Sequence, residues 1–398
     1  MKEKLIVIGL FFILCTACDT ENNIETYYSD YFIKYYGVDG DQEGVDFEVL
    51  PDGYLVLGKN VYTNTVFLVR TDFSGNELWS KQFGEGADEV VDMVVNPDAG
   101  YMVVANTRAG TPNSKVMVFN VDNQGSVVQL DTFGLAGYDV HASSITTTRS
   151  GRFIITGYTN KVSTTGNLDV SDLFSFEIDE NMTAQSLWRS TYGWDGEDLG
   201  IKILERDNGY VFFGTTDHKT SNNIPRDRTN MFLFPINSIG DQTSTFPLQL
   251  YGTNAAEVAA DIVGLRDGGY AMVGASINGA RRTPFMVRVT SNGTTIFQNQ
   301  FTDIGSMELK SVVQSADGNF LVLGVLYEDN GSNITILKIA ADGRLLWYRL
   351  FGGEDSNLPG RIKELEDGSI LFVSTIELEN QTKMALIKVT PAGELTHQ

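Results

Sequence analysis

Asp267-Gly268-Gly269-Tyr270 is one copy of a phrase that returns seven times along the chain. Each copy is a tight turn followed at once by an aromatic or apolar residue. The residues in that position are Tyr54, Tyr101, Phe153, Tyr210, Tyr270, Phe320 and Ile370. They are separated by 47, 52, 57, 60, 50 and 50 residues. A fixed period near fifty residues predicts an array of seven similar units, each packed on its neighbours.

One period contains four strand-like segments. In the clearest copy, apolar runs over 89–95, 101–105 and 116–121 are separated by turn or loop segments, and a fourth run ends at Phe133-Gly134. Short β-rich runs joined by Asp-Gly or Asn-Gly turns are typical of antiparallel hairpins. Four such strands make one blade, and seven blades predict an all-β, seven-bladed β-propeller.

The seventh copy lacks a fourth strand. It has a second strand at 370–373 and a third at 384–389, and only a few residues follow. The missing phrase stands near the N-terminus, where Phe32, Lys34 and Tyr36 match Trp79, Lys81 and Phe83 of the first copy. We therefore expect residues 31–37 to complete the last blade and close the ring, which leaves no open sheet edge.

The fourth strands carry a phrase of their own, Leu78-Trp79 followed by Phe83-Gly84 in the first copy and Leu346-Trp347 followed by Phe351-Gly352 in the sixth. Side chains alternate along a strand, so the Trp, the basic residue and the Phe share one face. We interpret these aromatic residues as packing between neighbouring blades. An aromatic platform for a sugar is the alternative interpretation.

The repeat resembles that of the secreted and lipoprotein β-propellers common in Bacteroidota. Their blades read Asp-Gly-Gly-Tyr, then Gly, then Leu-Trp and Phe-Gly. The resemblance covers essentially the whole chain from about Tyr31. It implies the propeller fold and says almost nothing about function, because one fold serves many functions.

The N-terminus resembles the signal peptide of a bacterial lipoprotein. Lys2 and Lys4 precede a short apolar run over 5–14, and Cys18 follows two small residues. Cys15 stands where the usual pattern has Leu, and an ordinary secretory signal is the alternative. The expected organisation is a signal peptide over 1–17, a flexible tether over 18–30 and the propeller over 31–398.

These features predict where the protein is located. Cys18 would carry the lipid, and the acidic residues after it resemble the surface-export signal of Bacteroidota lipoproteins. We expect an outer-membrane protein held by its lipid alone, with the cell-surface side favoured. The net charge of -22 argues against a nucleic-acid partner, which would need a basic surface.

Evidence for catalysis is thin. The three histidines, His141, His218 and His397, have no metal-ligand neighbour at useful spacing, and no nucleophile elbow or phosphate loop is present. We therefore predict no enzyme activity, no catalytic residues and no protein-bound metal. Acidic residues in the loops that lead into each blade could hold Ca²⁺ as a group. The alternative, which we favour, is that each one caps its own loop. The residues are Asp88, Glu89, Glu197, Asp198, Glu257, Glu308, Glu354 and Asp355.

Strand order places the longer, variable loops on one face, and we expect binding there. The predicted loops are 158–172, 215–230 and 275–284. The outer loops of blades two to five are comparatively basic in an otherwise acidic chain, and arginine suits contacts with carboxylates. The candidate binding residues are Lys161, Lys219, Arg226, Arg228, Arg281 and Arg282. Ordinary loop solvation is the simpler interpretation of this pattern.

These observations favour a non-catalytic role. We expect a protein-binding scaffold or accessory subunit of an outer-membrane complex. The alternative is a surface glycan-binding lipoprotein for polysaccharide uptake. Exposed aromatic residues in the long loops would favour that alternative, and Tyr158 and Tyr327 are the candidates.

Overall fold

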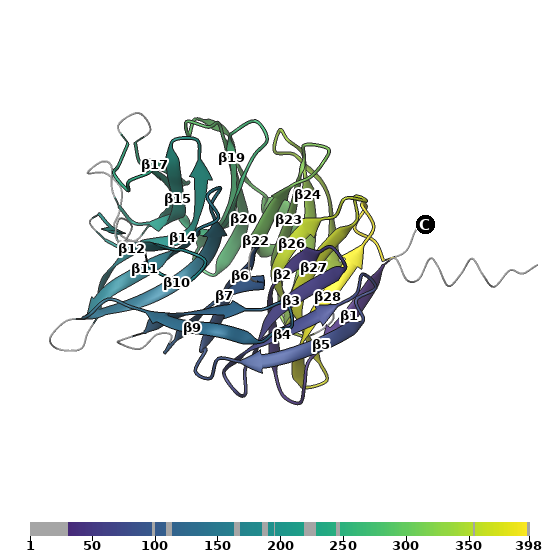
Figure 1. Cartoon of the computed structure of the whole chain (residues 1–398). Coiled ribbons are helices and arrows are strands. Elements are labelled where there is room, and N and C mark those ends of the chain that lie inside the picture. Colours follow the sequence, from purple (N-terminus) through teal and green to yellow (C-terminus); the bar gives the residue numbers. More distant parts are fainter. Residues whose placement is uncertain are drawn as a thin grey trace, which may run out of the picture.

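The chain folds into a ring of seven four-stranded antiparallel sheets, as predicted from the repeat. The computed structural model describes residues 31–97, 100–108, 114–162, 168–184, 190–194, 196–218, 228–243, 247–352 and 355–395. Figure 1 shows the sheets following one another around the ring in sequence order, with the first and last strands side by side. Within these residues no helix has the length and apolar character needed to cross a bilayer.

Each blade takes four strands in order from the channel outward. Blade 1 has β2 (Gln42–Leu50), β3 (Gly53–Asn60), β4 (Thr65–Thr71) and β5 (Glu77–Phe83). Blade 2 has β6 (Glu89–Asn96), β7 (Gly100–Thr107), β8 (Lys115–Val121) and β9 (Val127–Phe133). Blade 3 has β10 (Tyr138–Thr147), β11 (Phe153–Val162), β12 (Leu168–Ile178) and β13 (Ser190–Tyr192). Blade 4 has β14 (Asp198–Arg206), β15 (Gly209–Thr216), β16 (Asn230–Ile236) and β17 (Gln249–Tyr251).

The remaining blades follow the same order until the last, which borrows a strand. Blade 5 has β18 (Ala256–Gly264), β19 (Tyr270–Asn278), β20 (Arg281–Val289) and β21 (Thr295–Gln300), followed by the 3-10 turn η1 (Thr302–Ile304). Blade 6 has β22 (Ser306–Gln314), β23 (Phe320–Glu328), β24 (Gly331–Ile339) and β25 (Leu345–Phe351). Blade 7 has β26 (Leu358–Glu364), β27 (Ile370–Leu378), β28 (Gln381–Val389) and β1 (Phe32–Tyr36).

The N-terminal strand closes the ring, which confirms the prediction. β1 pairs antiparallel with β28, with Phe32 opposite Lys388 and Tyr36 opposite Met384. The seven first strands also contact one another in sequence, and β26 contacts β2 to complete the circle. The first strands therefore line a central channel.

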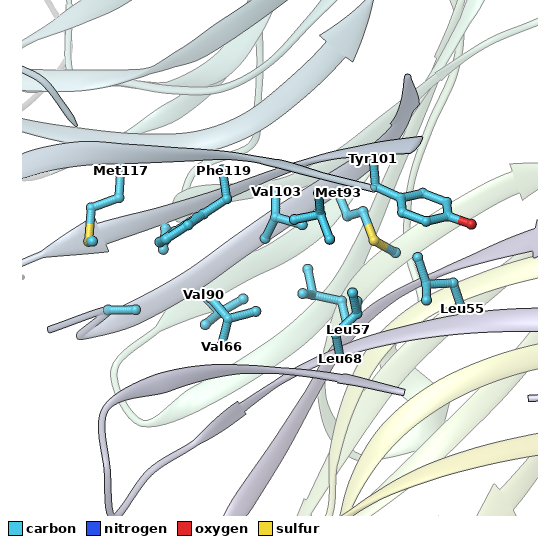
Figure 2. Packing of buried hydrophobic residues seen from close by; sticks show 13 residues of the cluster. Leu55, Leu57, Val66, Leu68, Val90, Met93, Tyr101, Val103, Met117 and Phe119 are labelled. Atoms are coloured by element: carbon cyan, nitrogen blue, oxygen red, sulfur yellow. The ribbon is translucent and has the colours of Figure 1, made fainter. Parts of the chain in front are cut away.

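Apolar side chains fill the space between neighbouring blades. Figure 2 shows Leu57 and Leu68 of blade 1 facing Val103 and Met93 of blade 2, with Phe119 packed beside them. Each such side chain is almost fully buried. Burial of one Leu or Phe contributes roughly 1.5–3 kcal/mol, so the interfaces between blades hold much of the folding energy.

The aromatic residues of the fourth strands contact the next blade, as interpreted from the sequence. A Cβ atom added to Gly125 in the β8–β9 turn would lie 2.6 Å from the ring of Trp79 in blade 1. Gly125 has a φ of 79°, a conformation that glycine adopts without strain. Trp347 of blade 6 contacts Gly393 of blade 7 in the same way. These recurrent contacts are structural packing.

Two of the predicted loops are shorter than expected. Ala275 pairs with Pro284 and Asn278 with Arg281, so blade 5 has a two-residue turn where a ten-residue loop was expected. In blade 3, Tyr158 pairs with Leu173, and strands occupy most of 158–172. The strands extend further than expected because exposed strand ends tolerate polar residues, which also occur in loops. Of the predicted loop 215–230, the stretch 219–227 lies outside the described residues.

Candidate functional site

The first strand of every blade has a bulge at the same level of the channel. In six blades one residue of the first strand has no pairing partner on the second strand, for example Val91 between Val90 and Asp92. In blade 7 it skips two, Gly360 and Arg361. A bulge bends its strand and redirects the side chains beside it. The first-strand residues that follow the bulges line one cavity, and residues before or at the bulges of blades 2 to 5 line another.

The larger cavity lies on the side of the short turns and has a volume of about 380 Å³. We call it the channel chamber. First strands from all seven blades contribute to its wall. Its polar and charged lining residues are Asp46, Glu48, Asp92, Thr146, Thr147, Lys202, Asp261, Ser311, Arg361 and Lys363.

Asp261 is the centre of an ion-pair network in the chamber. Its carboxylate lies 2.8 Å from Nζ of Lys202 and 3.3 Å from Arg361. It also accepts hydrogen bonds from the backbone N–H groups of Ile262 and Val312, the latter in the next blade. Burial would raise the pKa of Asp261, but the two cations and these hydrogen bonds outweigh it and lower that pKa. Asp261 is therefore held as an anion.

The pKa of Asp92 is shifted in the opposite direction from that of Asp261. Burial, partly opposed by the charge of Arg361 and reinforced by Asp46, raises the pKa of Asp92 to about 7. The charge of the neighbouring Asp46 carboxylate and a side-chain hydrogen bond between Asp46 and Asp92 both add to this rise. Asp92 also accepts a hydrogen bond of 3.0 Å from the backbone of Ile145 in the next blade.

The second cavity, of about 280 Å³, lies on the other side of the bulges and is lined by Glu89, His141 and Tyr158 among others. The rings of His141 and Tyr158 are stacked with centroids 4.9 Å apart. Nε2 of His141 lies 3.1 Å from both Asp139 and Ser114. A catalytic triad needs the two partners on different ring nitrogens, so this is not one. Ser114 is also buried and donates to the carbonyl of Val140.

The acidic residues of the loops leading into the blades serve local contacts where the structure describes them. Asp88 accepts the backbone N–H of Arg108, and Glu89 accepts from Asn106. Glu257 accepts from Thr253 and Ser276. Further contacts of this kind are Ser171 N–H to Glu197, Trp194 N–H to Asp198, and Arg282 and Lys310 to Glu308. Asp198 and Glu257 thus contact their own entry loops, as expected, whereas Asp88, Glu89, Glu197 and Glu308 accept from residues of another loop or strand.

No cation site is assembled from these acids in the described residues. Asp355 is described, whereas Glu354 is not. Across the described ranges, no group of three or more His, Cys, Asp or Glu residues is placed to hold a metal ion. The expectation that the protein binds no metal stays a prediction, and calcium titration of the purified chain tests it.

The predicted basic residues do not form one cluster in the part of the chain that is described. Arg282 pairs with Glu308 and lies over the ring of Tyr327, 5.5 Å from its centroid. Arg281 donates to the carbonyl of Thr302 at 2.7 Å. Arg228 is half-buried. Lys219 and Arg226 lie outside the described residues, as do the side chain of Lys161, the lipidation candidate Cys18 and His397.

The outermost strand of blade 6 has an exposed apolar stripe that sequence analysis did not identify. Leu346, Tyr348 and Leu350 of β25 are 47%, 44% and 47% exposed. They alternate with the half-buried Trp347, Arg349 and Phe351, so they share one face of the strand. The corresponding residues of β5 in blade 1 are Leu78, Ser80 and Gln82. The stripe therefore distinguishes blade 6 from blade 1.

Sequence analysis also missed the channel chamber. Its charged residues come from the first strands of five blades, two each from blades 1 and 7 and one each from blades 2, 4 and 5, and they differ in type from blade to blade. One signal was available, namely a charged residue inside an apolar first strand. Val45-Asp46-Phe47, Val91-Asp92-Met93 and Ala260-Asp261-Ile262 are examples.

Comparison with known proteins supports the fold. No protein-family model matches this sequence, and no curated protein matches it. Among solved structures, a polysaccharide lyase that is an ulvan lyase has a TM-score of 0.57 at 9% identity, over 92% of this chain and 98% of that chain. The polysaccharide lyase Uly1 has a TM-score of 0.56 at 11% identity, over 94% of each chain.

A third similar structure is a puromycin hydrolase, with a TM-score of 0.52 at 11% identity. The match covers 89% of this chain and 54% of that one, so the chain spans about half the length of the hydrolase. Identities this low establish a shared propeller fold and leave function open.

Proposed function

We propose that this chain is a non-catalytic, lipid-anchored outer-membrane protein that binds a protein partner, as a scaffold or accessory subunit of an outer-membrane complex. The observation that carries the proposal is the apolar stripe of Leu346, Tyr348 and Leu350. Within the described residues, β25 pairs only with β24, so its outer edge presents backbone N–H and C=O groups. Exposed apolar side chains beside an unpaired edge are typical of protein-binding surfaces.

The contacts of the chemically versatile residues favour binding over catalysis. His141 is stacked on Tyr158 and shares one nitrogen between two partners. Arg282 is bound to Glu308. The stacking and hydrogen bonds of His141 hold its ring against neighbouring loops, and the ion pair with Glu308 holds Arg282.

A native pull-down tests the proposal with a matched variant. Tyr348→Ser with Leu350→Gln gives blade 6 the residues that blade 1 has at these positions. Leu78→Ser on blade 1 is the control. We expect the tagged wild type and the control to retain a stoichiometric β-barrel or second lipoprotein after mild detergent extraction, and the blade 6 variant to lose it. Recovery of wild type alone, or retention by the blade 6 variant, would count against the proposal.

The lipid anchor has its own test. Cys18→Ser should abolish incorporation of radiolabelled palmitate and move the protein from the membrane to the soluble fraction. Cys15→Ser is the control and should leave labelling unchanged. Labelling that survives Cys18→Ser would show that the N-terminus is not processed as proposed.

Glycan binding is the second candidate, and the cavity beside Tyr158 favours it. An aromatic ring next to polar groups such as Glu89 suits the apolar face and the hydroxyls of a sugar. Two of the similar structures are polysaccharide lyases, which adds modest support. Tyr158→Ala should abolish retention on a polysaccharide affinity gel, whereas Tyr327→Ala should not. Equal retention of the wild type and Tyr158→Ala would remove this candidate.

A further inference from the structure

Two of the four carboxyl groups of the channel chamber, those of Asp92 and Asp261, accept several hydrogen bonds from the protein. Asp92 accepts the backbone N–H groups of Met93 and Ile145, each at 3.0 Å, and a side-chain hydrogen bond links it to Asp46. Asp261 accepts two backbone N–H groups and the ammonium of Lys202. Buried carboxylates satisfied in this way hold neighbouring blades together and have little capacity left for a ligand.

The cations of the chamber use only part of their N–H donors in contacts with the protein. A guanidinium has five N–H donors, and among the described residues Arg361 makes one contact of 3.3 Å with Asp261 and a longer one of 3.9 Å with Asp92. Lys202 uses its ammonium on Asp261, and Lys363 uses its ammonium on Glu48 at 2.6 Å. Each ammonium has three donors. These three cations therefore keep N–H donors that could bind a ligand.

Solvent reaches these cations. The side chains of Arg361, Lys202 and Lys363 are 21%, 23% and 33% exposed. The chamber volume of about 380 Å³ is within the range of small-molecule sites, and its wall combines apolar residues with the hydroxyl groups of Thr146 and Ser311. A ligand with oxygen acceptors at one end and a mixed apolar and hydroxylated body would match this lining.

We propose that the channel chamber binds a small organic monocarboxylate, with the carboxylate held by Arg361. The guanidinium fork matches a planar carboxylate in bidentate geometry, which a spherical anion or an uncharged sugar cannot reproduce. Four carboxyl groups and three cations line the chamber, so the lining has no excess of positive charge that would favour a multiply charged ligand over a monoanion. This site is independent of the stripe on β25.

Calorimetric titration of the purified full chain tests the site with a matched pair of probes. D-Glucuronate and D-glucose share a ring and differ by one carboxylate. We expect glucuronate to bind with one site per chain and glucose to give no binding heat. Arg361→Lys keeps the charge and removes the fork, and it should weaken glucuronate binding by about tenfold or more. Arg344→Gln, at an exposed turn pair with Asp342, is the control and should bind like wild type.

The proposal is wrong if glucose and glucuronate bind equally or if neither binds. It is also wrong if Arg361→Lys binds glucuronate with unchanged affinity. Lys363→Gln covers the case in which Arg361→Lys does not fold. Lys363 pairs with Glu48 at the more exposed edge of the chamber, and its loss should weaken glucuronate binding several-fold while the wild type keeps its preference over glucose.

Discussion

The junction between blades 1 and 2 and the junction between blades 7 and 1 use the same contacts, but the outer strand is joined to its own blade differently. At the first, Trp79 packs on Gly125; at the second, Phe32 packs on Gly75, where an added Cβ atom would lie 2.8 Å from the ring. At both junctions the outer strand runs on into the first strand of the next blade, β5 into β6 and β1 into β2. Within blade 1 the chain also runs from β4 into β5, whereas in blade 7 β1 joins β28 through strand pairing. A blade junction therefore forms without a chain connection between the third and fourth strands of its blade.

Removing the borrowed strand should have the largest effect. Deletion of residues 31–37 leaves blade 7 with three strands and exposes the apolar cluster that includes Phe47 and Tyr54 of blade 1. We expect loss of the cooperative thermal transition in circular dichroism. Deletion of seven residues from the tether, 20–26, is the control and should leave the transition in place. An unchanged melting curve for the first deletion would show that closure contributes little.

Substitution of the turn glycines compares the two junctions directly. Gly125 and Gly75 have φ values of 79° and 72°, and both lie under an aromatic ring. Alanine at either position meets backbone strain and a clash, so each variant should lose about 2–4 kcal/mol of unfolding free energy. Urea denaturation measures both. A much larger loss for Gly75→Ala would mean that the closing junction is the weaker one.

The two junctions should also respond differently to pH at their channel ends. The first is spanned by the like-charged pair Asp46 and Asp92, and the second by the ion pair of Glu48 and Lys363. The folded-state pKa of Asp92, about 7, lies above its ordinary value of 3.8. Its contribution to stability is therefore present at low pH and is lost as the pH rises through 7.

Asp46→Asn removes one of the two like charges. Compared with wild type, this variant should be less destabilised between pH 5 and pH 8, by about 1–2 kcal/mol. Melting temperatures at the two pH values give the difference. Glu48→Gln at the other junction is the control and should follow the wild-type pH dependence. If the melting temperatures of wild type and Asp46→Asn change equally with pH, the charge of Asp46 does not raise the pKa of Asp92.

The smallest effect concerns a single hydroxyl at each type of junction. Tyr36 donates to the carbonyl of Gly75 at the closing junction, and Tyr251 donates to that of Gly293 between blades 4 and 5, each at 2.7 Å. Replacement by Phe leaves a buried carbonyl without its donor, at a cost of about 1 kcal/mol in each case. Chemical denaturation should give similar losses. A larger loss of unfolding free energy at one junction would show that the chain connection between the third and fourth strands, present in blade 4 and absent in blade 7, affects the strength of this contact.

The sequence allowed prediction of the repeated parts of the molecule. The anchors such as Tyr270, the turn signals and the match of Phe32, Lys34 and Tyr36 to a fourth strand each recur, and recurrence identifies structural roles. The channel residues could not be predicted in this way. Asp261, Lys202 and Arg361 occupy related positions in different blades, yet their chemistry depends on distances that only the closed ring brings about.

The borrowed strand also determines how the molecule bears load. β1 follows directly after the N-terminal segment that we propose as a lipidated tether, so tension between the membrane and a bound partner enters the propeller at Phe32. The first bonds to carry that tension are those that pair β1 with β28, from Phe32 opposite Lys388 to Tyr36 opposite Met384. A propeller pulled at this end should therefore lose the pairing between β1 and β28 before any other strand pair separates.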